Sequence, residues 1–68
     1  MEFSKRVKAL RRENHLSQAE LAEKIGVSQQ CISEWERGKT EPTLSFIVKL
    51  SDIFNVSADY VICRTNNK

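Results

Sequence analysis

The stretch QAELAEKIGVSQQCISEWER, residues 18–37, carries a helical apolar pattern on both sides of one glycine. Its apolar and small positions are those that two short helices need when they share a core and meet steeply. A small side chain at Ala22 lets the helices approach closely, and Gly26 supplies the backbone geometry of a tight turn. The stretch therefore predicts helices over 18–25 and 29–37, and the positions on which this rests are Leu21, Ala22, Ile25, Gly26, Val27, Ile32 and Trp35.

Capping residues set the ends of these two helices. Ser17 and Glu20 have the spacing of a capping box, which starts the first of them. Ser28 is placed to cap the second helix, and Gly38 to end it. Helix boundaries and apolar spacing thus point to the same pair of elements.

The flanking sequence is also helical. Phe3, Val7 and Leu10 form one stripe and predict a helix over residues 2–14. Thr43 is placed to cap a fourth helix, which ends at Asn55, and Ser57 to cap a fifth, over 58–63. We expect an all-α, compact five-helix bundle as one domain, 1–63, followed by a polar tail, 64–68. The inward positions expected in the fourth helix are Leu44, Ile47, Val48, Leu50 and Phe54.

Composition excludes several classes of protein. The 68 residues contain no apolar run of membrane-spanning length and no signal peptide, which favours the cytoplasm. Cys31 and Cys63 lie far apart in the sequence, and neither forms a metal-binding pair, so we expect free thiols, with Cys31 partly buried. His15 has no catalytic partner at a recognisable spacing and is interpreted as a helix-end residue. We expect no metal, no cofactor and no enzymatic activity.

The net charge of +2 is unevenly distributed. Basic residues crowd the first helix, and such a cluster fits a polyanionic partner. A solvated helix face explains the same residues equally well. They are Lys5, Arg6, Lys8, Arg11 and Arg12.

The segments LSQAELAEKIGVSQQCISEWERGKTEP, residues 16–42, and NVSADYVI, residues 55–62, resemble the Cro and lambdoid-phage-repressor type of helix-turn-helix proteins, the XRE-like family. The resemblance extends from about Phe3 to Ile62. It implies a sequence-specific transcriptional regulator, a repressor, that inserts the helix 29–37 into the major groove of a palindromic double-stranded DNA operator. It also implies a weak homodimer that is strengthened on DNA.

The third helix supports this interpretation independently. Once the inward Ile32 and Trp35 are set aside, its remaining face is polar and mostly uncharged. Glutamine both donates and accepts, so it can pair with adenine N6 and N7. The alternative is a merely solvated face, where lysine and glutamate are more usual. The predicted base contacts are Gln29, Gln30, Ser33 and Glu34.

Phosphate contacts would fix the register on DNA. By similarity to the family, Gln18 should touch a phosphate and also brace Gln29, and the N-terminus of its helix suits an anion. Lys39 and Thr40 could equally be plain loop residues. The predicted phosphate contacts are Ser17, Gln18, Ser28, Arg37, Lys39 and Thr40.

Two acidic residues depart from the phage-repressor pattern. Glu34 stands where those repressors often place a neutral or basic reader, and a carboxylate there tolerates only a base that offers a donor, such as cytosine N4. Glu41 lies in a loop that is basic in the phage proteins. The operator sequence therefore cannot be transferred from them.

The resemblance assigns two further sets of residues. Arg11 and Glu36 match an arginine and a glutamate that join two helices as a structural ion pair. Phe46, which is off the inward stripe, is predicted to be exposed and to form a dimer patch with Ala58 and Val61. The alternative is that Phe46 folds back over the fifth helix of its own subunit.

Two other functions compete with DNA binding. The same bundle could hold a protein partner, with DNA binding lost or secondary, and an antitoxin would combine both activities. A pure interaction module would not need Gln18, Gln29 and Gln30 together. An enzyme is the least favoured class, because no nucleophile–base pair or phosphate-binding loop can be drawn.

Overall fold

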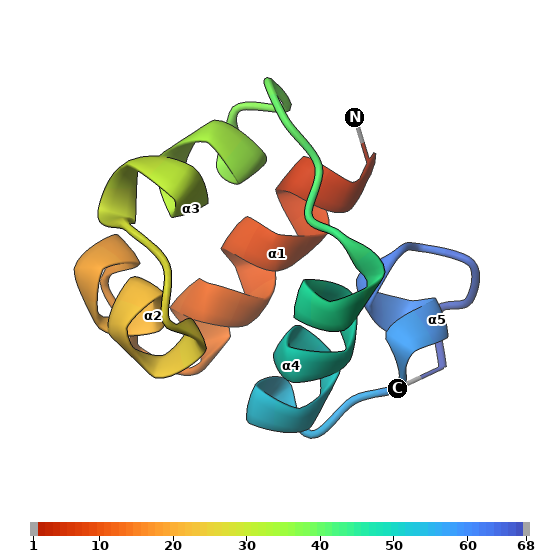
Figure 1. Cartoon of the computed structure of the whole chain (residues 1–68). Coiled ribbons are helices and arrows are strands. Elements are labelled where there is room, and N and C mark those ends of the chain that lie inside the picture. The colour runs from red at the N-terminus through yellow and green to blue at the C-terminus, as the bar shows by residue number, and fades with distance from the viewer. Residues whose placement is uncertain (1, 68) are drawn as a thin grey trace.

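The computed structural model describes residues 2–67, which form five helices and, within that range, no strand (Figure 1). They are α1 (Glu2–Glu13), α2 (Gln18–Ile25), α3 (Gln29–Glu36), α4 (Leu44–Phe54) and α5 (Ala58–Val61). In Figure 1, α1 lies between the α2–α3 pair on one side and the α4–α5 pair on the other. The expected all-α five-helix bundle is confirmed.

The helix starts follow the predicted caps, with one difference. Ser17 Oγ accepts from the Glu20 N–H at 3.0 Å, and Glu20 Oε1 accepts from the Ser17 N–H at 2.8 Å. The hydrogen bond from the Ser17 backbone, and after it the Ser17 side chain, lowers the pKa of the Glu20 carboxyl. Ser28 Oγ caps α3 through the Cys31 N–H. Thr43 lies at the N-cap of α4 but makes no side-chain cap bond, and its Oγ1 lies 3.1 Å from Ser45 Oγ.

Three helices end earlier than the apolar pattern predicts. α1 stops at Glu13, because His15 is left-handed, with φ of 57°, and the Leu16 N–H then bonds to the Arg11 carbonyl at 3.1 Å. α3 stops at Glu36. α5 stops at Val61, and the chain turns left-handed at Cys63 (φ 67°). Residues at these ends satisfy their backbone groups locally, which apolar spacing cannot indicate.

The core draws on all five helices. It runs from Phe3 in α1 to Val61 in α5 and is formed by the inward-facing side chains of the five helices. The buried hydrophobic side chains are Phe3, Val7, Leu10, Leu21, Ala22, Ile25, Ile32, Trp35, Ile47, Leu50, Phe54 and Val61.

The prediction for α4 was wrong at two positions. Ile47, Leu50 and Phe54 point inward, but Leu44 is 78% exposed and Val48 is 47% exposed. Leu44 shares the helical spacing of the inward stripe. It is the first residue of α4, however, and at that end of the helix its side chain does not reach the core. Val48 lies on the flank of the stripe, one position after Ile47.

Candidate nucleic-acid interface

The turn between α2 and α3 holds the two helices together. Gly26 adopts a left-handed conformation with φ of 89°, and its N–H donates to the Ala22 carbonyl at 2.8 Å. The Val27 N–H reaches the same carbonyl at 3.0 Å. This arrangement ends α2 abruptly and lets the chain start α3 three residues after the glycine. Leu21 and Ile25 of α2 and Ile32 and Trp35 of α3 then share one core.

The predicted base-reading residues lie together on the outer side of α3. Gln29 and Gln30 are exposed, and Ser33 and Glu34 are half-buried. Ile32 and Trp35 are buried in the core. The helical spacing of the four polar residues places them on one face, where their hydrogen-bonding groups reach solvent. This face can take up a polar partner without disturbing the core.

A buried ion pair fixes the C-terminal end of α3. Arg11 Nε donates to Glu36 Oε2 at 2.6 Å and its second terminal nitrogen donates to Oε1 at 3.0 Å, which makes the pair bidentate. The side chains are only 11% and 3% exposed. The bond to Glu36 raises the pKa of the Arg11 guanidinium. Arg11 also donates to the Leu16 carbonyl at 2.8 Å, so it joins α1, the turn before α2 and α3.

Gln18 joins this ion pair rather than bracing Gln29, which corrects the prediction for it. Gln18 Nε2 donates to Glu36 Oε1 at 3.1 Å. A carboxylate attracts an amide donor more strongly than a neutral glutamine does, so Glu36 is the better acceptor within reach. No pattern in the sequence indicates the bond, because the two residues lie on different helices. It ties the N-terminal turn of α2 to the last turn of α3.

The other predicted phosphate contacts lie around the same face. The hydroxyls of Ser17 and Ser28 cap their helices and accept backbone N–H bonds, and both residues are exposed. Arg37 follows α3, and its Nε donates to the Ser33 carbonyl at 3.4 Å. Lys39 and Thr40 are exposed in the loop after α3. No contact in the structure tests the roles predicted for these residues.

The basic cluster of α1 divides into two groups. Lys5, Lys8 and Arg12 are exposed, whereas Arg11 is held by Glu36. The Arg6 guanidinium lies 3.9 Å from the centre of the Tyr60 ring and donates to the Tyr60 carbonyl and to Asn66 Oδ1. Two of the basic side chains therefore stabilise the fold, and the sequence did not indicate the long-range contact of Arg6.

The predicted dimer patch was wrong at two of its three positions. Val61 is fully buried in the core. Phe46 is half-buried and packs on Trp35, with the ring centres 5.8 Å apart. The prediction failed because it used only the apolar spacing within α4, which does not indicate a contact with Trp35 on α3. Ala58 is half-buried against the core.

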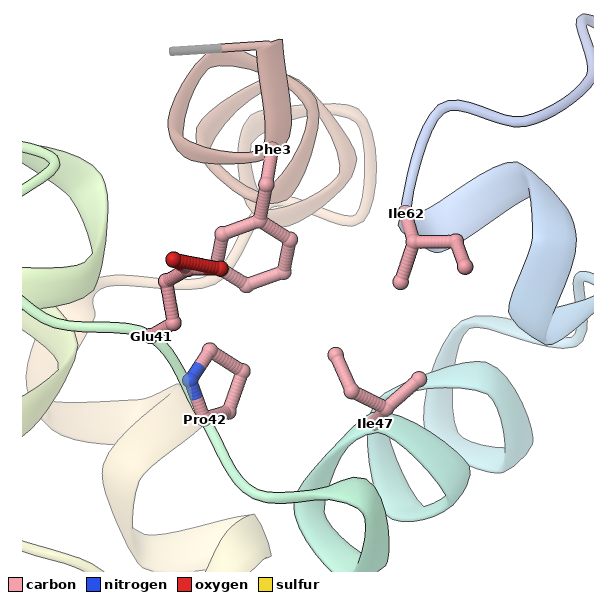
Figure 2. A pocket seen from close by; sticks show the side chains of 5 residues that line it. All are labelled: Phe3, Glu41, Pro42, Ile47 and Ile62. Atoms are coloured by element: carbon pink, nitrogen blue, oxygen red, sulfur yellow. The ribbon is translucent and has the colours of Figure 1, made fainter.

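Other apolar side chains reach solvent instead. Besides Leu44 and Val48, Ile62 is 39% exposed. Figure 2 shows Phe3, Pro42, Ile47 and Ile62 around one hollow of about 200 Å³, with the Glu41 carboxylate beside the Phe3 ring. The hollow lies between the start of α1, the loop before α4 and the end of α5.

The described residues contain neither a metal-binding cluster nor a membrane-spanning helix. Within 2–67, no group of histidine, cysteine, aspartate and glutamate side chains is arranged to hold a metal ion. No helix in the same range is long and apolar enough to cross a membrane.

Solved structures share this arrangement of helices. The P22 c2 repressor protein, solved in complex with synthetic operator 9T, matches 87% of this chain and 89% of its own at a TM-score of 0.82 and 37% identity. SinR, described as the master regulator for biofilm formation and solved in complex with DNA, matches 88% of this chain and 97% of its own at a TM-score of 0.79 and 36% identity.

Sequence comparison points to the same group. The HTH-type transcriptional regulator YqaE of Bacillus subtilis is 30% identical over 66 residues, which are 97% of this chain and 57% of that regulator. The chain spans about half the length of several relatives that it matches. A family model described as helix-turn-helix matches residues 7–61. The chain therefore belongs to the helix-turn-helix family of the Cro and lambdoid-repressor type.

Proposed function

We propose that this chain is the sequence-specific DNA-binding part of a transcriptional regulator, a repressor, and that α3 enters the major groove of its operator. The observation that carries the proposal is the outer face of α3, where Gln29 and Gln30 are exposed side by side in the first helical turn. The N-terminal part of a recognition helix is the part that reaches base edges. The solved complexes of the P22 c2 repressor with an operator and of SinR with DNA support the proposal.

We assign each residue a contact with bases or with phosphates according to its position relative to the outer face of α3. Gln29, Gln30, Ser33 and Glu34 are the proposed base-reading residues. Residues at the helix starts and in the loop after α3 contact phosphates and set the register. The N–H groups at the start of α2 add a partial positive charge there. The proposed phosphate contacts are Ser17, Gln18, Ser28, Arg37, Lys39 and Thr40.

The Arg11–Glu36 pair has a structural role in this proposal. It is nearly buried, so it is not available to DNA, and it holds α3 against α1. Gln18 donates to the same carboxylate, so the start of α2 keeps a fixed position relative to α3. A rigid supporting layer of this kind lets a short helix present its side chains in a defined geometry.

We further propose a weak homodimer that forms mainly on DNA, since two-fold symmetric operators suit two copies of such a domain. Leu44, Val48 and Ile62 replace Phe46 and Val61 as the apolar side chains available for it. Contiguous exposed apolar surface is the usual sign of a protein contact. A chromosomal operator as target would place the chain in the cytoplasm.

The proposed function is tested by titrating the chain against duplex DNA at several salt concentrations. We expect binding that weakens steeply as salt rises, because each phosphate contact releases condensed counterions. A sequence selected from a random duplex library should bind about a thousandfold or more tighter than random duplex. Affinity that does not change with salt, or a library that yields no preferred sequence, would reject the proposal.

A matched pair of variants then tests the assigned face. Gln30→Ala should cost about 1–3 kcal/mol on the selected site and relax the preference at one or two base pairs. Asp52→Asn alters an exposed side chain on α4 and should leave the ranking of sites unchanged. Circular dichroism checks that both variants are folded. If Gln30→Ala keeps the wild-type ranking, this face of α3 does not read sequence.

A further inference from the structure

The two central residues of the outer face of α3 are not independent. Gln30 Nε2 donates to Glu34 Oε2 at 3.5 Å, one helical turn further along. A carboxylate only accepts hydrogen bonds, so the Gln30 amide must turn its NH2 group, rather than its carbonyl, toward Glu34. Gln30 is then left with its Oε1 acceptor and one remaining amide hydrogen for any other partner.

The Glu34 carboxylate has no oppositely charged partner among the described residues. The guanidinium of Arg37 donates to the Ser33 carbonyl instead. Glu34 is half-buried as a residue, and its hydrogen bond with Gln30 lies on the exposed side of α3. The charge therefore acts on the orientation of Gln30 throughout.

The edges of the bases respond differently to such a glutamine. Guanine presents two acceptors, O6 and N7, so a glutamine must give both amide hydrogens to satisfy them. Adenine presents one donor, N6, and one acceptor, N7, which match the remaining Oε1 and hydrogen of Gln30. Cytosine N4 can also donate to Oε1, whereas thymine O4 cannot. A hydrogen that is already given to Glu34 thus removes the bidentate contact with guanine, whereas the bidentate contact with adenine stays possible.

We infer that Glu34 is a specificity-determining residue that acts through Gln30. It restricts the base under Gln30 to one with an exocyclic amino group in the major groove, adenine before cytosine, and it disfavours guanine, whose amino group lies in the minor groove. The inference rests on the proposed function, because it requires α3 to lie in the major groove. Among the proposed base-reading residues, Glu34 is then a positioning residue that orients Gln30 rather than a direct base contact. Its removal widens the choice of base without unfolding the domain.

The test compares base preferences of the whole chain and its variants. Sites are selected from a random duplex library with the wild type, and Gln30→Ala identifies the base pair that Gln30 reads. At that base pair the wild type should prefer adenine over guanine by roughly 5- to 150-fold, the usual worth of a bidentate base contact. Glu34→Gln keeps the size of the side chain and removes its charge. It should lose most of this preference, and the gain in affinity beyond that of the charge control should be confined to sites that carry guanine there.

Asp52→Asn is the matched control, because it removes one negative charge from an exposed position on α4. It accounts for the uniform rise in affinity that any loss of negative charge gives, and it should keep the wild-type ranking of bases. Circular dichroism confirms that each variant is folded before binding is measured.

Three results would overturn the inference while the proposed function stands. Glu34→Gln could keep the wild-type ranking, the wild type could prefer guanine under Gln30, or the preference could change at a base pair that Gln30 does not read. The last result would mean that Glu34 contacts a base directly. A wild type that binds no duplex selectively would overturn the proposed function and the inference together.

Discussion

The inner and outer faces of α3 carry one glutamate each, and the two side chains have opposite surroundings. Glu36 is 3% exposed and accepts hydrogen bonds from Arg11 and Gln18. Glu34 is half-buried, and among residues 2–67 the side-chain hydrogen bond to its carboxylate comes from the amide of Gln30. Two positions along an α-helix turn a side chain by about 200°, so neighbours in sequence face opposite sides. The face, rather than the residue type, decides whether a carboxylate holds the fold together or meets a ligand.

The largest effect should come from breaking the inner pair. Arg11→Met leaves the Glu36 carboxylate buried with one amide as its remaining side-chain partner, and we expect a loss of about 3–5 kcal/mol in the free energy of unfolding. The double variant with Glu36→Leu should lose less than the sum of the two single variants, because no charge is stranded. Urea unfolding of the four proteins measures this, and strictly additive losses would show that the pair has no energetic coupling.

The outer glutamate supplies the contrast. Glu34→Gln should change the free energy of unfolding by less than about 0.5 kcal/mol, because it breaks no buried contact. A loss as large as that of Arg11→Met would mean that both faces of α3 are structural.

The same contrast extends to α4, where Phe46 faces α3 and Leu44 faces solvent. Phe46→Ala removes a ring that packs on Trp35 and should cost about 2 kcal/mol in stability. Leu44→Ala should cost almost nothing, because Leu44 is 78% exposed. Thermal unfolding of both variants tests the assignment. A larger loss for Leu44→Ala than for Phe46→Ala would reverse it.

Leu44 should matter for assembly instead. Leu44→Asp should leave the monomer folded and weaken cooperative binding to a duplex with two half-sites. Sedimentation with and without that duplex separates the two effects. Unchanged cooperativity would remove Leu44 from the proposed dimer contact.

Residues whose environment depends on nearby sequence were predictable. Ser17, Gly26 and Ser28 set the ends of α2 and the start of α3, because capping acts within a few residues. The burial of Ile32 and Trp35 followed from helical spacing. The Arg11–Glu36 bond came from the family resemblance, since no spacing indicates it.

The failures involve contacts between distant elements. Phe46 was predicted to be exposed because the spacing within α4 does not indicate its contact with Trp35. Val61 was also predicted to be available, but it is buried because α5 packs against the rest of the core. Gln18 was given the wrong partner because Gln18 and Glu36 lie on different helices, which only the folded chain brings together. The roles predicted for the outer face of α3 stay predictions, because they concern a partner that the chain alone does not contain.

Gln18 contacts the buried ion pair and is also a proposed phosphate contact, so its removal should slightly lower both stability and DNA affinity. Gln18→Ala removes one hydrogen bond to Glu36 and should cost on the order of 1 kcal/mol in stability. It should also weaken DNA binding to good and poor sites alike, because a phosphate contact carries no sequence information. A panel of single-base operator variants measures the ranking, with Gln30→Ala as the variant that should alter it. A changed ranking for Gln18→Ala would make Gln18 a reader rather than a positioning residue.

The smallest effect uses Cys31 as a probe of the outer charge. Burial raises the pKa of the Cys31 thiol, and the negative charge of Glu34 raises it further. The thiolate is the reactive form, so alkylation below the pKa slows as the pKa rises. In a Cys63→Ser background only Cys31 reacts, because the chain has two cysteines. Glu34→Gln should shift the rate–pH profile of alkylation to lower pH. The shift should be smaller than the one that full exposure of the thiol would give, because burial is the larger cause of the raised pKa. Asp52→Asn should leave the profile in place, and a profile that does not move for Glu34→Gln either would mean that the Glu34 charge does not act on this side of α3.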